Sequence, residues 1–276
     1  KLSEFYEELK RLNINIIRPD INKCFADFRS DNNNFYYALG GVKAVGYLAV
    51  SNIVDERIKN GEFKSINDFI KRVKPKDINK LQLEGLVKSG SFDNINSNRH
   101  ALFSSIPNFI LKTKNNFANK VANQIDLFSS DEIKDKDIVL RVEDWKFEER
   151  LSKEFEAIGF FISDHPLNQF KEIFDDYNII DFKKFNSDKE IKENNIAATL
   201  LKIQERKTQK GNTYAIIKLT DLRSVFELFI FSDVLESNRN LLVEGNSLII
   251  TLSKNIVDGE NRFKRINVKK ISSLKD

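Results

Sequence analysis

The sequence is poor in the side chains that build covalent or metal-bound frameworks. A single cysteine, Cys24, excludes a disulfide framework and any site with several cysteine ligands. The two histidines, His100 and His165, lie far apart in the sequence and lack the spacing of a ligand pair. His165 precedes a proline, where we expect it to cap or pack rather than to catalyse. We therefore predict that this chain holds no metal and no cofactor.

Motifs for phosphate chemistry are also missing. The sequence contains neither a P-loop nor the Gly-x-Gly-x-x-Gly pattern that cradles a dinucleotide. Nucleotidyl transfer by two metal ions needs clustered carboxylates. The one Asp-x-Asp pattern, Asp135-Lys136-Asp137, falls in a charged run that is typical of a solvated linker. We therefore predict no catalytic residues and no activity for this chain alone.

Long apolar runs and methionine are absent as well. No segment approaches the length of a membrane span and no signal peptide is visible, so the sequence predicts a cytoplasmic protein without a membrane partner. The chain begins at Lys1 and has no methionine, which suggests a piece excised from a longer protein. Its 276 residues are enough for about two domains with cores of their own.

Charge is unevenly distributed along the chain, whose net charge is +4. Residues 1–120 carry a net charge of +7, residues 121–195 carry −8, and residues 196–276 carry +5. Two basic modules thus flank an acidic connector. Basic modules favour a polyanionic partner such as nucleic acid.

The first half of the chain is expected to be helical, because apolar residues recur there at helical spacing. Glycine turns at residues 44–46 and 89–92 join these helices into two helix-hairpin-helix units. Such a turn can direct backbone N–H groups toward a phosphate. For each turn, an ordinary helical hairpin with a glycine cap is the alternative. The predicted contacts with the backbone of duplex DNA are Lys43, Val45, Gly46, Lys88, Gly90 and Ser91.

The last part of the chain changes to the period of β-strands. Five strands are predicted at residues 196–203, 213–220, 225–231, 247–252 and 262–268, with a helix at 233–243 between the third and the fourth. Asp258-Gly259 marks a hairpin turn before the fifth strand. This order is the plan of an OB-fold β-barrel, so the predicted fold class is α+β with several domains.

Alternation along the second and third strands separates two faces of that barrel. One face is expected to fill the barrel, and the other shows aromatic rings beside cations, a surface on which bases of single-stranded DNA can stack. The alternative is that Phe229 and Phe231 pack under the connector. The predicted single-strand contacts are Tyr214, Lys218, Phe229 and Phe231, together with Arg206, Lys207 and Lys210 from the loop between the first two strands.

A short apolar stretch, Gln124-Ile125-Asp126-Leu127-Phe128, lies beside the acidic run. Burying Leu127 and Phe128 would stabilise by roughly 1.5–3 kcal/mol each, so their place next to a linker needs a reason. Either the pair folds back onto a neighbouring domain, or it enters a pocket on a partner protein in the manner of a linear motif.

Several motifs, taken together and in order, resemble the C-terminal region of the alpha subunit of bacterial DNA polymerase III, the C-family replicase. The resemblance covers essentially the whole chain. It is carried by residues 79–93 (NKLQLEGLVKSGSFD), 156–167 (EAIGFFISDHPL), 207–211 (KTQKG) and 225–235, which includes the step Phe231-Ser232-Asp233.

The resemblance implies a division of labour along the chain. Residues 1–35 would be the tail of the fingers domain, 36–120 the tandem helix-hairpin-helix region, 121–150 an acidic linker, 151–195 connector helices, and 196–276 the OB domain. Gln124, Ile125, Asp126, Leu127 and Phe128 match the internal motif by which this family binds its sliding clamp, the beta subunit. On this view the aspartates that bind Mg²⁺ lie elsewhere in the full-length polymerase, and the remaining holoenzyme subunits are further partners.

One residue departs from the family pattern. The first hairpin of the family usually reads Gly-Val-Gly, and Ala44 replaces the first glycine here. A methyl group at this turn restricts close approach of a phosphate, so the first hairpin can be structural. The alternative function for the whole chain is a separate nucleic-acid-binding adaptor in repair or RNA metabolism.

Overall fold

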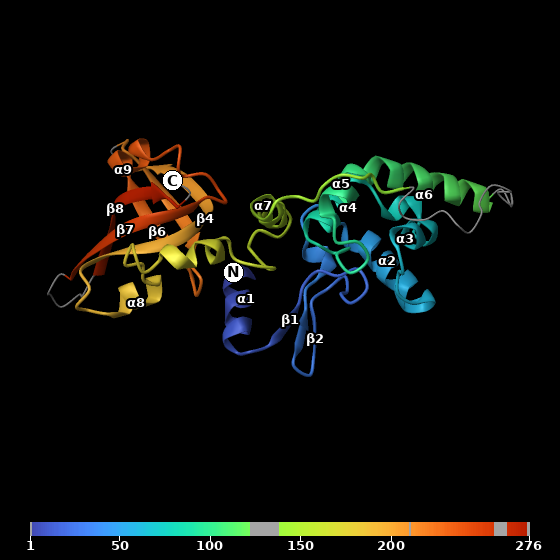
Figure 1. Cartoon of the computed structure of the whole chain (residues 1–276), viewed down its shortest axis with the longest axis horizontal. Coiled ribbons are helices and arrows are strands. Elements are labelled where there is room, and N and C mark those ends of the chain that lie inside the picture. Colours follow the sequence, from blue (N-terminus) through green and yellow to red (C-terminus); the bar gives the residue numbers. More distant parts are fainter. Residues whose placement is uncertain (1, 122–137, 210, 257–263, 275–276) are drawn as a thin grey trace. The chain divides into compact units, whose positions relative to one another are not determined.

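The computed structural model describes residues 2–121, 138–209, 211–256 and 264–274 (Figure 1). The chain divides into two compact units, a helical unit and a sheet unit. The helical unit comprises Leu9–Ser163, and the sheet unit comprises Asp164–Asp276 together with Lys1–Glu8. Helix α1 (Leu2–Arg11) therefore has residues in both units. The domain borders predicted near residues 35, 120 and 150 all fall within the helical unit, and they stay predictions about the domains of a longer protein.

Helices predominate in the helical unit, as the sequence period predicts. Apolar side chains on their inner faces, such as Leu39, Ile53, Ile70 and Leu86, are almost completely buried. The elements after α1 are β1 (Asn15–Ile17), β2 (Arg29–Asp31), β3 (Asn34–Tyr36), η1 (Leu39–Gly41), α2 (Tyr47–Asn60), α3 (Ile66–Arg72), η2 (Pro75–Asp77), α4 (Lys80–Lys88), α5 (Arg99–Ser104), α6 (Ile106–Val121) and α7 (Phe147–Ile158).

Polar residues before the helices explain where three of them begin. Ser65 accepts a hydrogen bond from the backbone N–H of Asp68 and so caps α3. Asn79 caps α4 and Asn98 caps α5 by the same kind of bond. These caps satisfy N–H groups that a helix leaves without internal partners, so they fix the helix starts locally.

The prediction of an entirely helical first half is wrong at a small three-stranded sheet of order β1-β3-β2. Strand β3 pairs in parallel with β1 and antiparallel with β2. As a result, the first glycine turn follows β3 and the short helix η1 instead of an α-helix.

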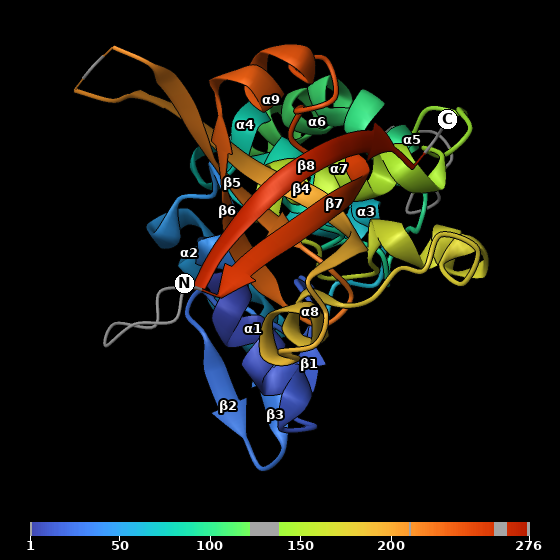
Figure 2. The same cartoon turned by 90° about the vertical axis from the view of Figure 1, so that its left-hand side faces the viewer.

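The sheet unit contains the five predicted strands, all antiparallel, in the order β6-β5-β4-β7-β8. Figure 2 shows β7 and β8 toward the viewer and the hairpin from β4 to β5 extending beyond the other strands. The strands are β4 (Glu193–Lys207), β5 (Thr213–Thr220), β6 (Val225–Phe231), β7 (Ser247–Ile256) and β8 (Lys264–Ser273), and several are longer than predicted.

Short helices surround this sheet. They are η4 (Pro166–Ile173), α8 (Phe182–Ser187) and α9 (Ser232–Ser237). The predicted helix at residues 233–243 is therefore shorter than expected, because turns follow α9. On one side of the sheet, Phe185, Ile217 and Ile250 belong to a continuous apolar core. On the other side, Leu167 of the η4 segment packs over Ala197, which covers the first half of β4.

Strands β6 and β8 are the two edges of this sheet. Some of their Cα atoms lie within 8 Å of one another. Among the described residues they share no ladder of hydrogen bonds, so the sheet is open in its backbone pairing. The α+β class is thus present, with a helical unit and a five-stranded antiparallel sheet.

Candidate nucleic-acid interface

Aromatic side chains line the outer face of β5 and β6. Tyr214 is paired with Phe231 across the two strands, and Ile216 is paired with Phe229. The rings of Tyr214 and Phe229 are stacked, with centroids 6.5 Å apart and planes at 26°. We call the surface formed by Tyr214, Ile216, Phe229 and Phe231 the aromatic face.

The two faces of these strands differ in burial as the alternation predicts. Ala215, Ile217 and Leu219 of β5 are fully buried in the core. On the aromatic face, Phe229 remains 52% exposed and Phe231 remains 48% exposed. Neither ring is therefore fully buried under the connector, and about half of the surface of each residue is accessible to a planar ligand.

Strand β4 adds cations and an amide to the same face. Arg206 is the direct partner of Tyr214, and Lys202 is the direct partner of Lys218. Side chains of directly paired residues project from the same face of a sheet. Arg206 also donates a hydrogen bond from Nη2 to Oε1 of Gln204 at 3.3 Å. Lys202 and Gln204 were not predicted from the sequence, and the strand register identifies them.

A further cation, Lys207, is the last residue of β4 and pairs with Thr213, so its side chain projects from the face opposite Arg206 and Tyr214. Lys207 is exposed. The backbone N–H of Thr208 bonds to the carbonyl of Asn212 at 2.9 Å, so the loop is closed by the chain itself. Gly211 has a φ of +83°, a conformation that glycine adopts readily. Lys210, which was also predicted to contact DNA, lies outside the described residues.

Lys218 already has a partner within the sheet unit. Its Nζ lies 3.0 Å from Oε1 of Glu4 on α1, and it faces Glu227 across β5 and β6. The hydrogen bond from Lys218 lowers the pKa of Glu4 below its ordinary value. A phosphate would have to replace the Glu4 carboxylate to reach this lysine.

In the first glycine turn, Ala44 has a φ of +63°. This left-handed conformation is uncommon for residues other than glycine. The backbone N–H of Lys43 bonds to the carbonyl of Ala157 at 2.8 Å, and the N–H of Val45 bonds to Val42 at 3.2 Å. The turn lies close to α4, since a Cβ on Gly85 would approach the Lys43 carbonyl to 2.6 Å.

Two of the predicted contacts at this turn remain at the surface. Gly46 occupies the N-cap of α2, where the structure shows no side-chain cap on the first helical turn. The side chain of Lys43 is exposed, whereas Val45 is buried with only 8% of its surface exposed. Uncapped N–H groups at a helix start, beside a lysine, are suitable donors for a phosphate.

The second glycine turn is bonded internally. Gly90 has a φ of +79°, and its N–H bonds to the carbonyl of Val87 at 3.0 Å. Ser91 is 1% exposed and its N–H bonds to Leu86 at 2.9 Å. Lys88 forms an ion pair of 2.9 Å with Glu156. The ordinary glycine-capped hairpin describes this turn, and DNA contact by Lys88, Gly90 and Ser91 stays a prediction.

The remaining candidates have structural partners or are not described. His165 accepts a hydrogen bond from the N–H of Leu167 at its Nδ1, so it caps η4 as expected. Cys24 is fully buried, and burial raises the pKa of its thiol to about 12. Gln124, Ile125, Asp126, Leu127 and Phe128 lie outside the described residues.

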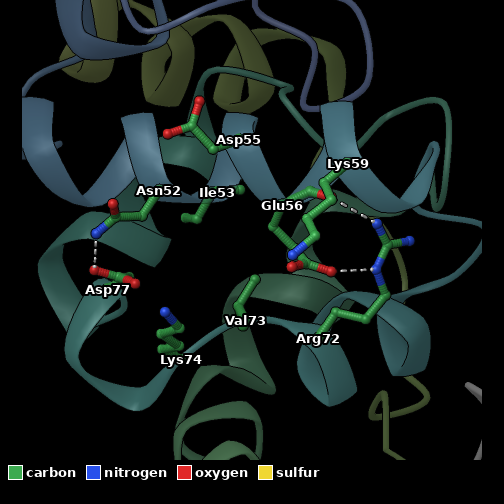
Figure 3. A pocket seen from close by; sticks show the side chains of 9 residues that line it. All are labelled: Asn52, Ile53, Asp55, Glu56, Lys59, Arg72, Val73, Lys74 and Asp77. Atoms are coloured by element: carbon green, nitrogen blue, oxygen red, sulfur yellow. Dashed lines mark hydrogen bonds and ion pairs between the residues drawn. The ribbon is translucent and has the colours of Figure 1, made fainter.

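A polar pocket of about 290 Å³ opens beside α2 and α3 in the helical unit. Figure 3 shows that its walls bond to one another: Asn52 donates to Asp77 at 2.7 Å, and Arg72 pairs with Glu56 at 3.1 Å. Lysines and carboxylates alternate around it, so its charge favours neither an anion nor a cation. In the part of the chain that the structure describes, no three His, Cys, Asp or Glu side chains form a metal-binding group.

None of the described helices combines the length and the apolar character that a membrane span requires.

Comparison with known proteins gives one consistent family. A family model described as a helix-hairpin-helix motif matches residues 13–102. The chain is 32% identical to the DNA polymerase III subunit alpha of Borreliella burgdorferi over 100% of its own length and 25% of that protein. The same subunit of Rickettsia bellii is 31% identical, with 100% and 26% covered, and that of Caulobacter vibrioides is 28% identical, with 95% and 23% covered. The chain thus spans about a quarter of the length of the curated relatives it matches. The resemblance inferred from the sequence motifs is confirmed.

Proposed function

We propose, since this chain is related over its whole length to the alpha subunit of bacterial DNA polymerase III, that it is a DNA-handling region of a replicative polymerase. In the full-length protein the proposed activity is DNA-directed DNA synthesis with Mg²⁺, carried out by residues outside this chain. The proposed role of this C-terminal region is to hold DNA and to tether the enzyme to its sliding clamp in the cytoplasm.

The aromatic face carries the first part of this proposal. We propose that the sheet unit is an OB domain, because its strand order places the short helix α9 between the third and fourth of five antiparallel strands. Such domains bind single strands by stacking bases on aromatic rings while cations follow the phosphates. Tyr214, Phe229 and Phe231 supply rings, and Arg206 next to Tyr214 supplies a cation.

The cation pattern suggests how a strand would lie on this face. Lys202 and Arg206 are exposed on β4, the strand next to β5, and they project from the face that carries the rings. Lys207 at the end of β4 projects from the opposite face. If the phosphates of a strand followed β4 and its bases lay over β5 and β6, the cations would pair with phosphates while the rings stacked on bases. Lys218 would join them only after releasing Glu4.

Duplex DNA is proposed to contact the first glycine turn. The uncapped start of α2 after Gly46 offers backbone N–H donors, and Lys43 adds a positive charge nearby in the sequence. These groups bind phosphate oxygens, so this contact would be independent of base sequence. The helix-hairpin-helix family match over residues 13–102 supports a DNA-binding role for this part of the chain.

The sliding clamp is the third proposed partner. Gln124 would bond at the rim of a clamp pocket, and Leu127 and Phe128 would fill it, as the family motif implies. The support for this is the sequence motif together with the family relationship. A separate nucleic-acid-binding adaptor is disfavoured, because the similarity extends over 100% of the chain instead of one module.

Single-strand binding provides the test of the aromatic face. We expect Phe229→Ala/Phe231→Ala to weaken binding of a fluorescently labelled single strand, measured by anisotropy at low salt. Tyr177→Ala is the matched control, because Tyr177 is 50% exposed in the same unit but lies off the face. Equal affinities of the double variant and the wild-type chain would refute the assignment of this face.

A further inference from the structure

The second glycine turn is filled by an arginine from the following helix. Arg99 of α5 is buried, with a side chain that is 3% exposed. A Cβ on Gly90 would lie only 2.1 Å from Nη2 of Arg99, so the guanidinium rests directly against the glycine. Arg99 also donates from Nη1 to the carbonyl of Lys88 at 3.0 Å, the last residue of α4. The guanidinium therefore packs against the backbone of this turn.

A carboxylate on each side holds this guanidinium in place. Asp93 accepts two hydrogen bonds from Arg99, at 2.9 Å from Nε and at 2.7 Å from Nη2. Glu154 of α7 accepts from Nη1 at 3.4 Å, and its side chain is 1% exposed. Arg150, one helical turn before Glu154, bonds to Asp93 at 3.1 Å. Helix α7 is thus connected to the turn through two of its residues.

The second oxygen of Glu154 binds the backbone where the helical unit ends. Its Oε1 accepts hydrogen bonds from the N–H of Ile162 at 3.0 Å and from the N–H of Ser163 at 2.9 Å. Ser163 is the last residue of the helical unit, and the chain continues from there into the sheet unit. One carboxylate therefore connects the buried arginine of α5, which packs against the second turn, to the point at which the chain leaves the unit.

Burial makes this arrangement sensitive to the loss of any member. A buried charge that loses its partner is strongly unfavourable, whereas exposed ion pairs contribute little. Arg99 and Glu154 are both almost inaccessible to water, so neither can exchange its partner for solvent without local opening. The exit of the chain is consequently fixed by a contact that depends on the second turn.

We propose that Asp93, Arg99 and Glu154 form a joint that holds residues 162–163 against the second glycine turn. By fixing this exit, the joint sets one of the two points at which the chain passes between the units, the other being within α1, when both units hold one DNA molecule. Arg99 and Glu154 are positioning residues and do not contact DNA. The part that concerns DNA rests on the proposed function, whereas the fixed exit does not.

Tethering has a measurable consequence for binding. When two linked modules bind one ligand, the second contact is intramolecular, and its strength depends on whether the linkage fits the ligand. A DNA that joins a duplex to a single-stranded overhang should therefore bind the whole chain more tightly than either part alone. Loosening the joint should reduce this advantage without changing the affinity for each part.

The test uses a variant that removes both buried charges and keeps the side-chain volume. Arg99→Met/Glu154→Met is chosen because a buried ion pair can be replaced by apolar residues of similar size without loss of the fold. Lys153→Met is the control, because Lys153 neighbours Glu154 on α7 but pairs with Glu156 at the surface. Hydrogen exchange of the backbone amides is measured first, and anisotropy with the joined DNA, the duplex and the single strand second.

We expect exchange at Ile162 and Ser163 to be at least about tenfold faster in the double variant, with amides inside α2 unchanged. Affinity for the joined DNA should fall by about three- to tenfold, while the affinities for the two separate ligands stay the same. Lys153→Met should behave as the wild-type chain in both measurements.

Three other outcomes have distinct meanings. Unchanged exchange at Ile162 and Ser163 would overturn the joint. If exchange at Ile162 and Ser163 is faster but the double variant still binds the joined DNA as tightly as the wild-type chain does, the role of the joint in tethering is overturned. If the wild-type chain itself binds the joined DNA no better than its parts, binding of one DNA by both units fails, and the exchange measurement alone decides the joint.

Discussion

Arg206 and Tyr214 are direct partners across the antiparallel pair of β4 and β5. Their side chains consequently share one face, where a guanidinium stands beside an aromatic ring. This pairing combines the two kinds of contact that binding of a single strand needs, a cation for the phosphate and a ring for the base. It also provides separate ways of testing each contact.

Removing one ring should reduce affinity without changing the dependence on salt. We expect Phe229→Ala to weaken single-strand binding by about 1–3 kcal/mol, or roughly 5- to 150-fold in Kd, because one stacking surface is lost. Anisotropy over a range of salt concentrations measures both quantities. A changed slope with an unchanged affinity would contradict stacking at this position.

Removing a cation should have the opposite effect. Each phosphate contact that is lost should reduce the slope of log K against log salt by about 0.7 for a single strand. We expect Arg206→Gln and Lys202→Gln each to show this reduction, because both side chains project from the aromatic face. Arg223→Gln is a suitable control, because Arg223 is exposed in the same unit and lies 3.6 Å from Asp181. Slopes equal to that of the wild-type chain would exclude these two cations from the contact.

The pKa of the Glu4 carboxyl group should depend on its hydrogen bond with Lys218. Its pKa in the folded chain is lowered from the ordinary value of 4.5. The depressed pKa means that this contact stabilises the folded chain above about pH 4.5 and is lost as pH falls through the lowered pKa. We expect an NMR titration of Glu4 to have a midpoint below 4.5, and Lys218→Gln to raise it. A midpoint that does not respond to Lys218→Gln would contradict the contact.

Two glycines with similar φ angles should respond differently to alanine. Gly61 and Gly90 have φ values of +85° and +79°. A Cβ on Gly61 would meet nothing within 4 Å, so Gly61→Ala should cost only the backbone strain of a φ of 85° and a ψ of 174°, about 1–3 kcal/mol. Gly90→Ala must also displace the buried Arg99, and its free energy of unfolding should fall by at least about 3 kcal/mol. Urea denaturation compares them, and equal losses would show that Arg99 moves freely.

Replacing Ala44 by glycine should increase the stability of the folded chain. Its φ of +63° is strained for alanine, so Ala44→Gly should relieve this strain, offset in part by the greater entropy of the unfolded chain. We expect a net gain in stability of up to about 1 kcal/mol. Removal of the methyl group should also increase affinity for duplex DNA. Lower stability together with lower duplex affinity would show that the methyl group is a favourable packing contact.

The clamp motif is tested by removing its three expected anchors. We expect Gln124→Ala/Leu127→Ala/Phe128→Ala to abolish binding to the cognate clamp, measured by surface plasmon resonance, because the pocket loses its apolar filling and rim contact. Ile125→Ala is the milder control within the same stretch. Clamp affinity equal to that of the wild-type chain would exclude this motif as the clamp contact.

Much of the sheet unit could be predicted from the sequence, because its strands have a clear period of two. The alternation of Ala215, Ile217 and Leu219 with outward residues was sufficient to assign the faces of β5. The period failed at β4, where an irregularity between Leu200 and Lys202 shifts the register. Before it, even-numbered residues such as Ala198 face the core, and after it Lys202 faces outward. A β-bulge of this kind has no clear signal in the sequence.

The helical unit was less predictable, because its deciding contacts join residues far apart in the chain. Strands β1, β2 and β3 have three residues each, too few for a period to appear. The glycine of the second turn suggested a phosphate site, but Arg99 fills that turn and Glu154 of α7, far along the chain, secures it. A turn motif specifies the backbone path, whereas its accessibility depends on the side chains that pack against it.

The ion pair between Lys218 and Glu4 affects what a salt titration can count. A phosphate that displaces Glu4 releases a cation from the DNA, but the freed carboxylate attracts one in return. The exchange is then nearly neutral in ions, so Lys218 can contact DNA without adding to the slope. Salt dependence would therefore report Arg206 and Lys202 but miss Lys218, so it would underestimate the number of phosphate contacts by one.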